Sequence, residues 1–270
     1  MTPSRDWNRA FDNMAHVAGS AQLPAHWAAE GAAYRDSGVR VEQDIAYGDA
    51  PREKLDIVWP EGSPKGLAVF VHGGYWMRLE KAHWSQFAEG ARARGWAVAL
   101  PSYTLTPNAR ISEITQQITR ALTVAAERVA GPIRLSGHSA GGHLVARMLC
   151  QDTALPAAVT DRIEHVLSIS GLHDLRPLLH TGMNETLHLD MAEATAESPA
   201  LHRPLPGGQL TAWVGGGELP EFIRQAQLMA MMWDGLDAQT RCVVDSVHHH
   251  FSVIEALKDP QSPLCDAFLG

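Results

Sequence analysis

Ser139 lies in the segment GHSAGG (137–142), with one glycine two residues before it and another two residues after it. The flanking residues are typical of a short strand, IRLSG (133–137), that leads into a helix, AGGHLVARMLC (140–150). Glycine on both sides permits a sharp bend that exposes the serine hydroxyl, and the helix start directs amide N–H groups toward developing negative charge. The pattern predicts a serine nucleophile for acyl transfer. The alternatives are a plain strand–helix turn or a phosphate-binding loop, but neither phosphate-binding glycine pattern is present.

A second glycine-containing segment, HGGYW (72–76), follows an apolar strand-like run. Acyl transfer needs hydrogen-bond donors that are in position before the negative charge appears. Two adjacent glycines let backbone amides approach a carbonyl oxygen without steric obstruction. We therefore predict an oxyanion hole formed by the amides of Gly73, Gly74 and Ala140, with His72 fixing the loop through hydrogen bonds of its ring. The alternative is an ordinary turn between a strand and a helix.

A general base is expected at the carboxyl end of a late strand, where HHHF (248–251) occurs. Ser252 and Glu255 have the spacing of a helix capping box, which predicts His250 in the loop before that helix. The two preceding histidines are weaker candidates for the base. A run of three histidines also raises the possibility of a metal site. Adjacent residues seldom reach one ion, however, and no H-E-x-x-H or Cys/His pairing accompanies them, so we predict no metal.

The acid that orients the histidine is expected after the preceding strand, where WVGGGELPEF (213–222) offers Glu218. The alternative for this residue is a solvated loop glutamate. Asp245 is a rival acid, but it lies within the last predicted strand rather than beyond its end. Asp237 lies at the opposite end of the sheet. The resulting order along the chain, serine then acid then histidine, is one of the orders in which catalytic triads occur.

Strands and helices alternate along the chain after residue 35, which predicts one α/β domain covering residues 1–270 with a mostly parallel sheet. The opening segment, residues 1–35, is predicted as a helical arm and a candidate lid. The first two strands, joined by a short turn, are predicted as an antiparallel edge. The predicted strands are 41–47, 54–60, 67–73, 96–103, 133–137, 165–171, 210–217 and 241–247.

Helical spacing of apolar residues predicts the helices between these strands. The segment 174–205 is predicted to be irregular and partly helical. In a sheet of this kind, functional residues lie beyond the carboxyl ends of the strands, where Ser139, the HGGYW segment, Glu218 and His250 are expected. The predicted helices are 83–95, 111–130, 140–150, 220–235 and one that begins in 252–259.

The composition excludes several classes of function. The chain has 270 residues, 45% of them hydrophobic, a net charge of -8 and no block of like charges, which argues against a surface for nucleic acid or membrane. The N-terminus has no apolar signal region, no run of about 18 apolar residues occurs, and three widely spaced cysteines favour reduced thiols in a cytoplasm. We expect a small-molecule substrate and no cofactor. The sequence allows a homodimer but does not determine the oligomeric state.

Four segments together resemble the kynurenine formamidase (arylformamidase) branch of the α/β-hydrolases: HGGYW, GHSAGGHL, VGGGELPEFIRQ and HHFSVIE. Ser198-Pro199 is similar to a Ser-Pro pair that such proteins carry before the acid strand. The similarity covers roughly residues 40 to 260. It implies an α/β-hydrolase fold, hydrolysis of N-formyl-L-kynurenine to formate and L-kynurenine in tryptophan breakdown, and Ser139, Glu218 and His250 as the triad.

Two residues depart from the pattern of that branch. Glu218 stands where many relatives have Asp, and His249 stands before His250 where Asp is common. Tyr75, Trp76 and aromatic residues of the N-terminal arm are predicted as walls for an aromatic substrate, with core or lid packing as the alternative, above all for Trp7 and Trp27. Three functions therefore compete: an arylformamidase, a short-chain carboxylesterase or thioesterase, and a binding protein without turnover, which an intact triad disfavours.

Overall fold

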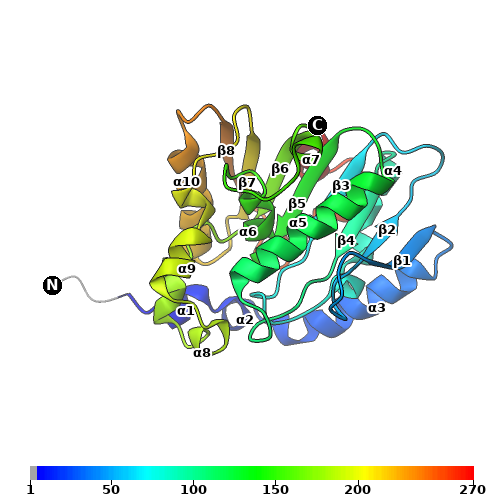
Figure 1. Ribbon diagram of the computed structural model, residues 1–270. Coiled ribbons are helices and arrows are strands. Elements are labelled where there is room, and N and C mark those ends of the chain that lie inside the picture. Colours follow the sequence, from blue (N-terminus) through cyan, green and yellow to red (C-terminus); the bar gives the residue numbers. More distant parts are fainter. Residues whose placement is uncertain (1–4) are drawn as a thin grey trace.

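A single eight-stranded sheet forms the centre of the computed structural model, which describes residues 5–270 (Figure 1). The strand order is β1-β2-β4-β3-β5-β6-β7-β8. β1 pairs with β2 and β2 with β4 in antiparallel fashion, and the other pairs are parallel. The predicted strands, the mostly parallel sheet and the antiparallel edge are thus confirmed. The strands are β1 Val41–Ala46, β2 Lys54–Val58, β3 Leu67–Val71, β4 Ala97–Pro101, β5 Ile133–His138, β6 Ile163–Ile169, β7 Gln209–Gly215 and β8 Gln239–Asp245.

The register of the central strands determines where the loops emerge. β3 and β5 are parallel neighbours, and Val71 at the end of β3 pairs with Gly137 near the end of β5. The loop after β3 and the bend after β5 therefore begin at the same level of the sheet. β3 and β4 are buried along their whole length. This burial explains why their sequences are continuous apolar runs rather than alternating ones.

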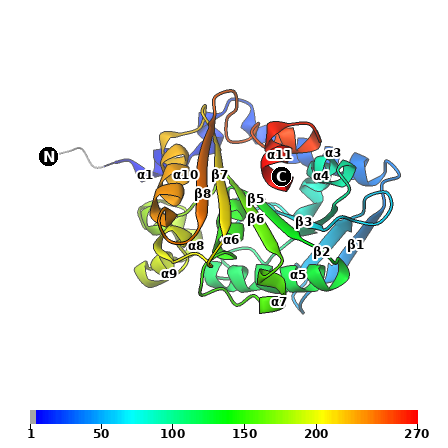
Figure 2. The same ribbon diagram turned by 90° about the horizontal axis from the view of Figure 1, so that it is seen from above.

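Helices cover both faces of the sheet (Figure 2). One face packs against α5, α6 and α10, and the other against α3, α4 and α11. The side chains of a strand alternate between these two cores, so that Val69 belongs to the first and Phe70 to the second. The α-helices are α1 Trp7–Phe11, α2 Asn13–His16, α3 Leu23–Arg35, α4 Glu89–Ala93, α5 Ile111–Arg128, α6 Ala140–Arg147, α7 Ala157–Thr160, α8 Asn184–Leu187, α9 Met191–Ala196, α10 Pro220–Trp233 and α11 Pro263–Leu269.

Two predicted helices were wrong, and both segments contain short 3-10 helices (labelled η). The predicted helix 83–95 consists of η2, η3 and the short α4. Its tighter 3-10 turns place Trp84 and Phe87, three residues apart, together in the core. The 3-10 helices are η1 Ser20–Gln22, η2 Lys81–His83, η3 Ser85–Ala88, η4 Arg176–His180, η5 Pro199–Leu201 and η6 Glu255–Lys258.

The predicted capping box at Ser252 was also wrong. The Ser252 hydroxyl accepts a hydrogen bond from the His249 amide at 3.0 Å, so it closes a turn with the residues before it instead of capping a helix after it. Turns and the 3-10 helix η6 follow. The α-helix begins only at Pro263, where the Ser262 hydroxyl accepts from the Cys265 amide.

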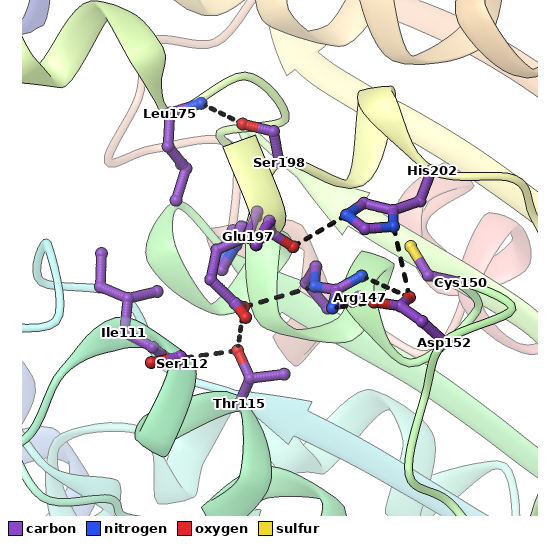
Figure 3. Close-up of polar contacts among 12 residues, drawn as sticks. Ile111, Ser112, Thr115, Arg147, Cys150, Asp152, Leu175, Glu197, Ser198 and His202 are labelled. Atoms are coloured by element: carbon purple, nitrogen blue, oxygen red, sulfur yellow. Dashed lines mark hydrogen bonds and ion pairs between the residues drawn. The ribbon is translucent and has the colours of Figure 1, made fainter. Parts of the chain in front are cut away.

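A buried polar network holds the irregular segment between β6 and β7 against α5 and α6 (Figure 3). Glu197 accepts hydrogen bonds from Thr115 at 2.6 Å and from Arg147 at 3.3 Å. Arg147 also makes two hydrogen bonds of 2.9 Å to Asp152. Beside them, the buried Ser198 hydroxyl accepts from the amide of Leu175 and donates to the carbonyl of Ala194. The Ser-Pro pair noted in the sequence thus anchors the chain that follows β6.

The N-terminal arm packs onto the carboxyl ends of the strands rather than extending away from them. Phe11 and Trp27 are buried, and the Tyr75 hydroxyl donates a 2.6 Å hydrogen bond to the Phe11 carbonyl. Residues 1–4 of the predicted arm lie outside the described residues. Within the described chain, none of the helices has the length and apolar character needed to cross a bilayer.

Candidate active site

Ser139 occupies a strained bend between β5 and α6. Its φ of 56° and ψ of -117° lie outside the regions that L-residues ordinarily adopt. A Cβ on Gly137 would lie 2.2 Å from the carbonyl oxygen of Gly141, and a Cβ on Gly141 would lie 1.9 Å from that of Val71. Only glycine fits at either position, which is the reason the sequence carries glycine on both sides of the serine.

The loop after β3 lies directly against Ser139. A Cβ on Gly73 would be 3.0 Å from the Cβ of Ser139, so the absence of a side chain allows this close approach. Gly74 has a φ of 112°, and its carbonyl accepts hydrogen bonds from the amides of Met77 and Arg78. Within residues 5–270, the amides of Gly73, Gly74 and Ala140 donate no hydrogen bond to another group of the protein. These three amides are free to bind an oxygen next to the serine.

His72 has the predicted structural position. Its ring lies stacked on Tyr103 with 4.3 Å between the centroids, and Nδ1 lies 2.7 Å from the Gly73 carbonyl oxygen. Burial lowers the pKa of His72 to about 3, so the ring stays neutral and Nδ1–H donates to that carbonyl. The hydrogen bond fixes the peptide group that joins Gly73 to Gly74.

Glu218 and His250 come together although 32 residues separate them. The Nδ1 of His250 lies 2.7 Å from Oε2 of Glu218, and both side chains are buried. The other carboxylate oxygen, Oε1, accepts hydrogen bonds from the Ser170 hydroxyl at 2.5 Å and the Gly215 amide at 2.8 Å. Ser170, directly after β6, is a supporting residue that sequence reasoning missed. Its position at a strand end was the available signal.

The rival candidates lie elsewhere. Asp245 ends β8 and accepts from the Val247 amide, and its nearest histidine contact is His248 at 3.9 Å. The ring of His249 accepts hydrogen bonds from the backbone instead. The three adjacent histidines thus have three different sets of partners. Within the described residues, no group of three His, Cys, Asp or Glu side chains could hold a metal ion.

Ser139 and His250 line the same cavity, whose volume is about 290 Å³. Within residues 5–270, the Ser139 hydroxyl makes no direct hydrogen bond to His250, whose ring contacts Glu218 instead. Such a contact often forms fully only when substrate is bound. The cavity is lined by Asn8, Phe11, Asp12, Asn13, Met14, Ser20, Leu23, Pro24, Trp27, Gly74, Tyr75, Arg78, Leu79, Trp84, His138, Ser139, Met183, His250 and Phe251.

The two aromatic residues after Gly74 have different environments. Tyr75 lines the cavity, as predicted for a substrate wall. The structure does not bring Trp76 there. It is fully buried, with its ring edge-to-face against His143 at 5.1 Å, which is the core packing considered as the alternative. Positive φ angles at both residues turn the chain so that the two side chains diverge.

The N-terminal arm supplies much of the cavity wall, including Phe11 and Trp27. The aromatic residues of the arm were predicted as walls for a substrate, with core or lid packing as the alternative; Phe11 and Trp27 line the cavity and are also buried. His138, the residue before the serine, also lines the cavity and donates through Nε2 to the His250 carbonyl at 2.8 Å. Burial lowers the pKa of His138 well below its usual value, so this ring stays neutral.

The fold and these residues define a class of protein. The chain belongs to the α/β-hydrolase fold family. The sequence model of that family matches residues 68–203. The mostly parallel sheet and the strained serine between a strand and a helix are consistent with that membership.

More specific relatives lie within this class. The kynurenine formamidases of Danio rerio and Salmo salar are 30% and 27% identical to this chain, and each match covers 80% of this chain and 76% of the relative. The crystal structure of an inferred thioesterase from Silicibacter sp. TM1040 superposes with a TM-score of 0.92 at 48% identity, covering 98% of this chain and 99% of that one. The protein is thus a kynurenine formamidase-like α/β-hydrolase, and the resemblance predicted from its motifs is confirmed.

Proposed function

We propose that the protein is a serine hydrolase that removes a small acyl group from an aryl formamide such as N-formyl-L-kynurenine. Ser139 is the nucleophile, His250 the general base and Glu218 the acid that orients it. No cofactor takes part. The observation that carries the proposal is the similarity to two kynurenine formamidases over three-quarters of their length, combined with a cavity that holds both Ser139 and His250.

In the first step, the Ser139 hydroxyl oxygen attacks the formyl carbon while Nε2 of His250 takes the hydroxyl proton. Glu218 accepts the Nδ1–H of His250 and so stabilises the imidazolium that forms. The amides of Gly73, Gly74 and Ala140 bind the resulting oxyanion. His250 then returns the proton to the nitrogen of the leaving group, the C–N bond breaks, and a formyl ester remains on the serine.

In the second step, water attacks the formyl ester. His250 takes a proton from the water and returns it to the serine oxygen as the ester bond breaks. Formate leaves and free Ser139 is restored. The geometry supports this order of steps. Nδ1 of His250 is bonded to Glu218, so Nε2 is the ring nitrogen that is left to exchange protons.

A short-chain thioesterase or carboxylesterase is the second candidate. The specific support for it is the 48% identity to the inferred Silicibacter thioesterase, which is higher than the identity to either formamidase. The same triad and oxyanion hole would serve an ester or thioester. The difference lies in the leaving group, because an amine must be protonated before it departs, whereas a thiolate leaves readily.

The deciding experiment compares kcat/KM for N-formyl-L-kynurenine, acetyl-CoA and a series of p-nitrophenyl esters with one enzyme preparation. If the protein is a formamidase, N-formyl-L-kynurenine should have the highest kcat/KM after each value is divided by the rate of uncatalysed hydrolysis of that substrate. Thioester or ester hydrolysis with no detectable formamide cleavage would transfer the function to the second candidate. An inactive Ser139→Ala protein controls for contaminating hydrolases.

A further inference from the structure

Asn13 is a buried polar residue of the cavity wall that has no partner in the protein. It begins α2 in the N-terminal arm and is only 1% exposed. Neither its carboxamide nitrogen nor its carboxamide oxygen makes a hydrogen bond to any described residue. Buried polar groups are almost always paired, because an unpaired one loses its bonds to water without replacement. An unpaired carboxamide at the cavity is therefore suited to a ligand that supplies the missing partner.

Arg78 provides a positive charge on the same cavity. Its backbone is fixed, since its amide donates to the Gly74 carbonyl, but its side chain is exposed and makes no ion pair within residues 5–270. Ten of the 18 arginines pair with carboxylates of the described residues, as Arg110 does with Glu193, and Arg78 is one of the eight that do not. A guanidinium left without a carboxylate beside an active-site cavity can bind one from a substrate.

Asp12 places a negative charge on the cavity wall as well. One of its oxygens accepts from the Ala15 amide at 3.0 Å, and it makes no ion pair with Arg78. The wall thus carries one cation and one anion that do not neutralise each other in a direct contact. Aromatic rings complete the cavity, with Trp27 lying 5.0 Å from Trp84 and 6.0 Å from Phe251 between ring centroids.

We propose that Arg78 and Asn13 are specificity-determining residues that bind the α-amino-acid head of the leaving group. Arg78 binds the carboxylate, Asp12 faces the ammonium, and Asn13 supplies a hydrogen bond to the polar part of the substrate between the head and the reacting carbonyl. This inference rests on the proposed function, because it names what the leaving side of that same cavity recognises. The substrate class is an aromatic amide or ester whose leaving group carries a zwitterionic head.

The first test measures binding and requires no turnover. The wild-type protein is titrated by calorimetry with L-kynurenine and with kynuramine, which lacks only the carboxylate. We expect about 10-fold tighter binding of L-kynurenine, as a charge-assisted hydrogen bond would give. Arg78→Gln removes the charge and should bring the two dissociation constants within about two-fold of each other. Arg203→Gln is the matched control, because Arg203 is also exposed, makes no ion pair within residues 5–270 and is not part of the cavity wall.

Two results overturn the role of Arg78. One is equal binding, or no binding, of both compounds by the wild-type protein. The other is a preference for L-kynurenine that Arg78→Gln retains or that Arg203→Gln removes equally.

The second test separates recognition by Asn13 from a structural role. Asn13→Leu keeps the side-chain volume and deletes both unpaired polar atoms. A residue held for its ligand should show weaker L-kynurenine binding in Asn13→Leu, by roughly 5- to 10-fold, together with an unchanged or higher melting temperature. A lower melting temperature with unchanged binding would mean that Asn13 serves the fold, and would overturn its proposed role.

A parallel measurement keeps this proposal distinct from the formamidase proposal. An enzyme that prefers L-kynurenine over kynuramine but fails to cleave N-formyl-L-kynurenine would contradict the function and leave the head-group site standing. An enzyme that cleaves N-formyl-L-kynurenine and N-formylkynuramine with equal kcat/KM would support the formamidase function and contradict the head-group site.

Discussion

His250 Nδ1 lies 2.7 Å from Oε2 of Glu218, and neither side chain is accessible to more than 3%. Because a carboxylate accepts hydrogen bonds, this contact selects the Nδ1–H tautomer of the neutral imidazole, in which Nε2 is the basic nitrogen. The carboxylate is itself held at its other oxygen by Ser170 and by the amide of Gly215. Residues at the carboxyl ends of β6 and β7 therefore orient the imidazole that follows β8. The strand ends of the sheet thus determine how the His250 ring is oriented at the cavity.

Ser139→Ala should abolish hydrolysis while leaving the fold intact, because no other described hydroxyl lies at the strained bend beside the free amides. Loss of a nucleophile of this kind costs on the order of 10⁴ to 10⁶ in kcat. The rate is measured on p-nitrophenyl acetate and on N-formyl-L-kynurenine. Ser136→Ala is the control, since Ser136 is also buried on β5 and its hydroxyl has no recorded partner. Turnover near the wild-type rate by folded Ser139→Ala would disprove the assignment.

Glu218→Gln should reduce kcat far more than Asp245→Asn does. An amide at position 218 cannot stabilise an imidazolium and can favour the wrong tautomer of His250, at a cost on the order of 10⁴ in kcat. Asp245 contacts His248 and the turn after β8 instead. Steady-state rates of the two variants, compared at matched melting temperatures, check this. Greater damage from Asp245→Asn would show that the acid is misassigned.

The strands and the contact between Glu218 and His250 were predictable from the sequence for one physical reason. Buried parallel strands leave continuous apolar runs, and the order of strand ends then places Glu218 next to His250 without any knowledge of distances. Asn13 was not predictable, because only the packing of the arm onto the sheet reveals that its carboxamide is unpaired.

The prediction that Trp76 forms a wall of the cavity was wrong for a different reason, which is the local backbone conformation. A side chain next to the oxyanion loop was expected at the cavity, but two consecutive positive φ angles, which the sequence does not signal, direct it into the core. The helix predicted for 83–95 was wrong because residues three apart share a face in a 3-10 helix as well as in an α-helix, so the spacing of Trp84 and Phe87 does not distinguish the two.

Stability should fall as the pH drops below about 6.5, the usual pKa of histidine in an unfolded chain. Burial holds the pKa of His72 and His143 at about 3 and that of His165 and His173 at about 4. As the pH falls, these histidines therefore bind protons in the unfolded state before they do so in the folded state. Between the unfolded and folded pKa values, this lowers the free energy of unfolding by about 1.4 kcal/mol per histidine and pH unit. Urea unfolding should give a value roughly 3 to 5 kcal/mol lower at pH 5.5 than at pH 7.5.

His143→Gln tests the cause of this pH dependence. Glutamine can keep a hydrogen bond to the Glu197 carbonyl that His143 makes at 2.6 Å, but it cannot titrate. The difference between pH 7.5 and pH 5.5 should shrink by about one histidine's contribution, whereas His180→Gln, at an exposed position, should leave it unchanged. An unchanged difference in His143→Gln would contradict the explanation. The Glu197 carboxyl acts in the opposite direction, because burial raises its pKa.

Activity should not depend on a metal ion. The rings of His248, His249 and His250 contact Ser252, backbone amides and Glu218, respectively, so they do not converge on one point. Prolonged dialysis against EDTA should leave kcat unchanged, and elemental analysis should find no stoichiometric zinc. Loss of activity that one specific metal restores would contradict this prediction and make the three histidines a ligand site.

Activity should fall steeply as the acyl group lengthens from formyl or acetyl to octanoyl. Gly73 approaches Ser139 so closely that a Cβ there would lie 3.0 Å from the serine Cβ, and Tyr75 is held over the cavity by its hydrogen bond to the Phe11 carbonyl. A formyl carbon carries only hydrogen, so the proposed function needs little room on the acyl side and more room for the leaving group, and residues of the N-terminal arm line the cavity that would hold it. The measurement is kcat/KM for p-nitrophenyl esters of increasing chain length, with alkaline hydrolysis rates as the control for intrinsic reactivity. A maximum at medium chain lengths would contradict the expected small acyl site, while the fold and the triad proposal would be unaffected.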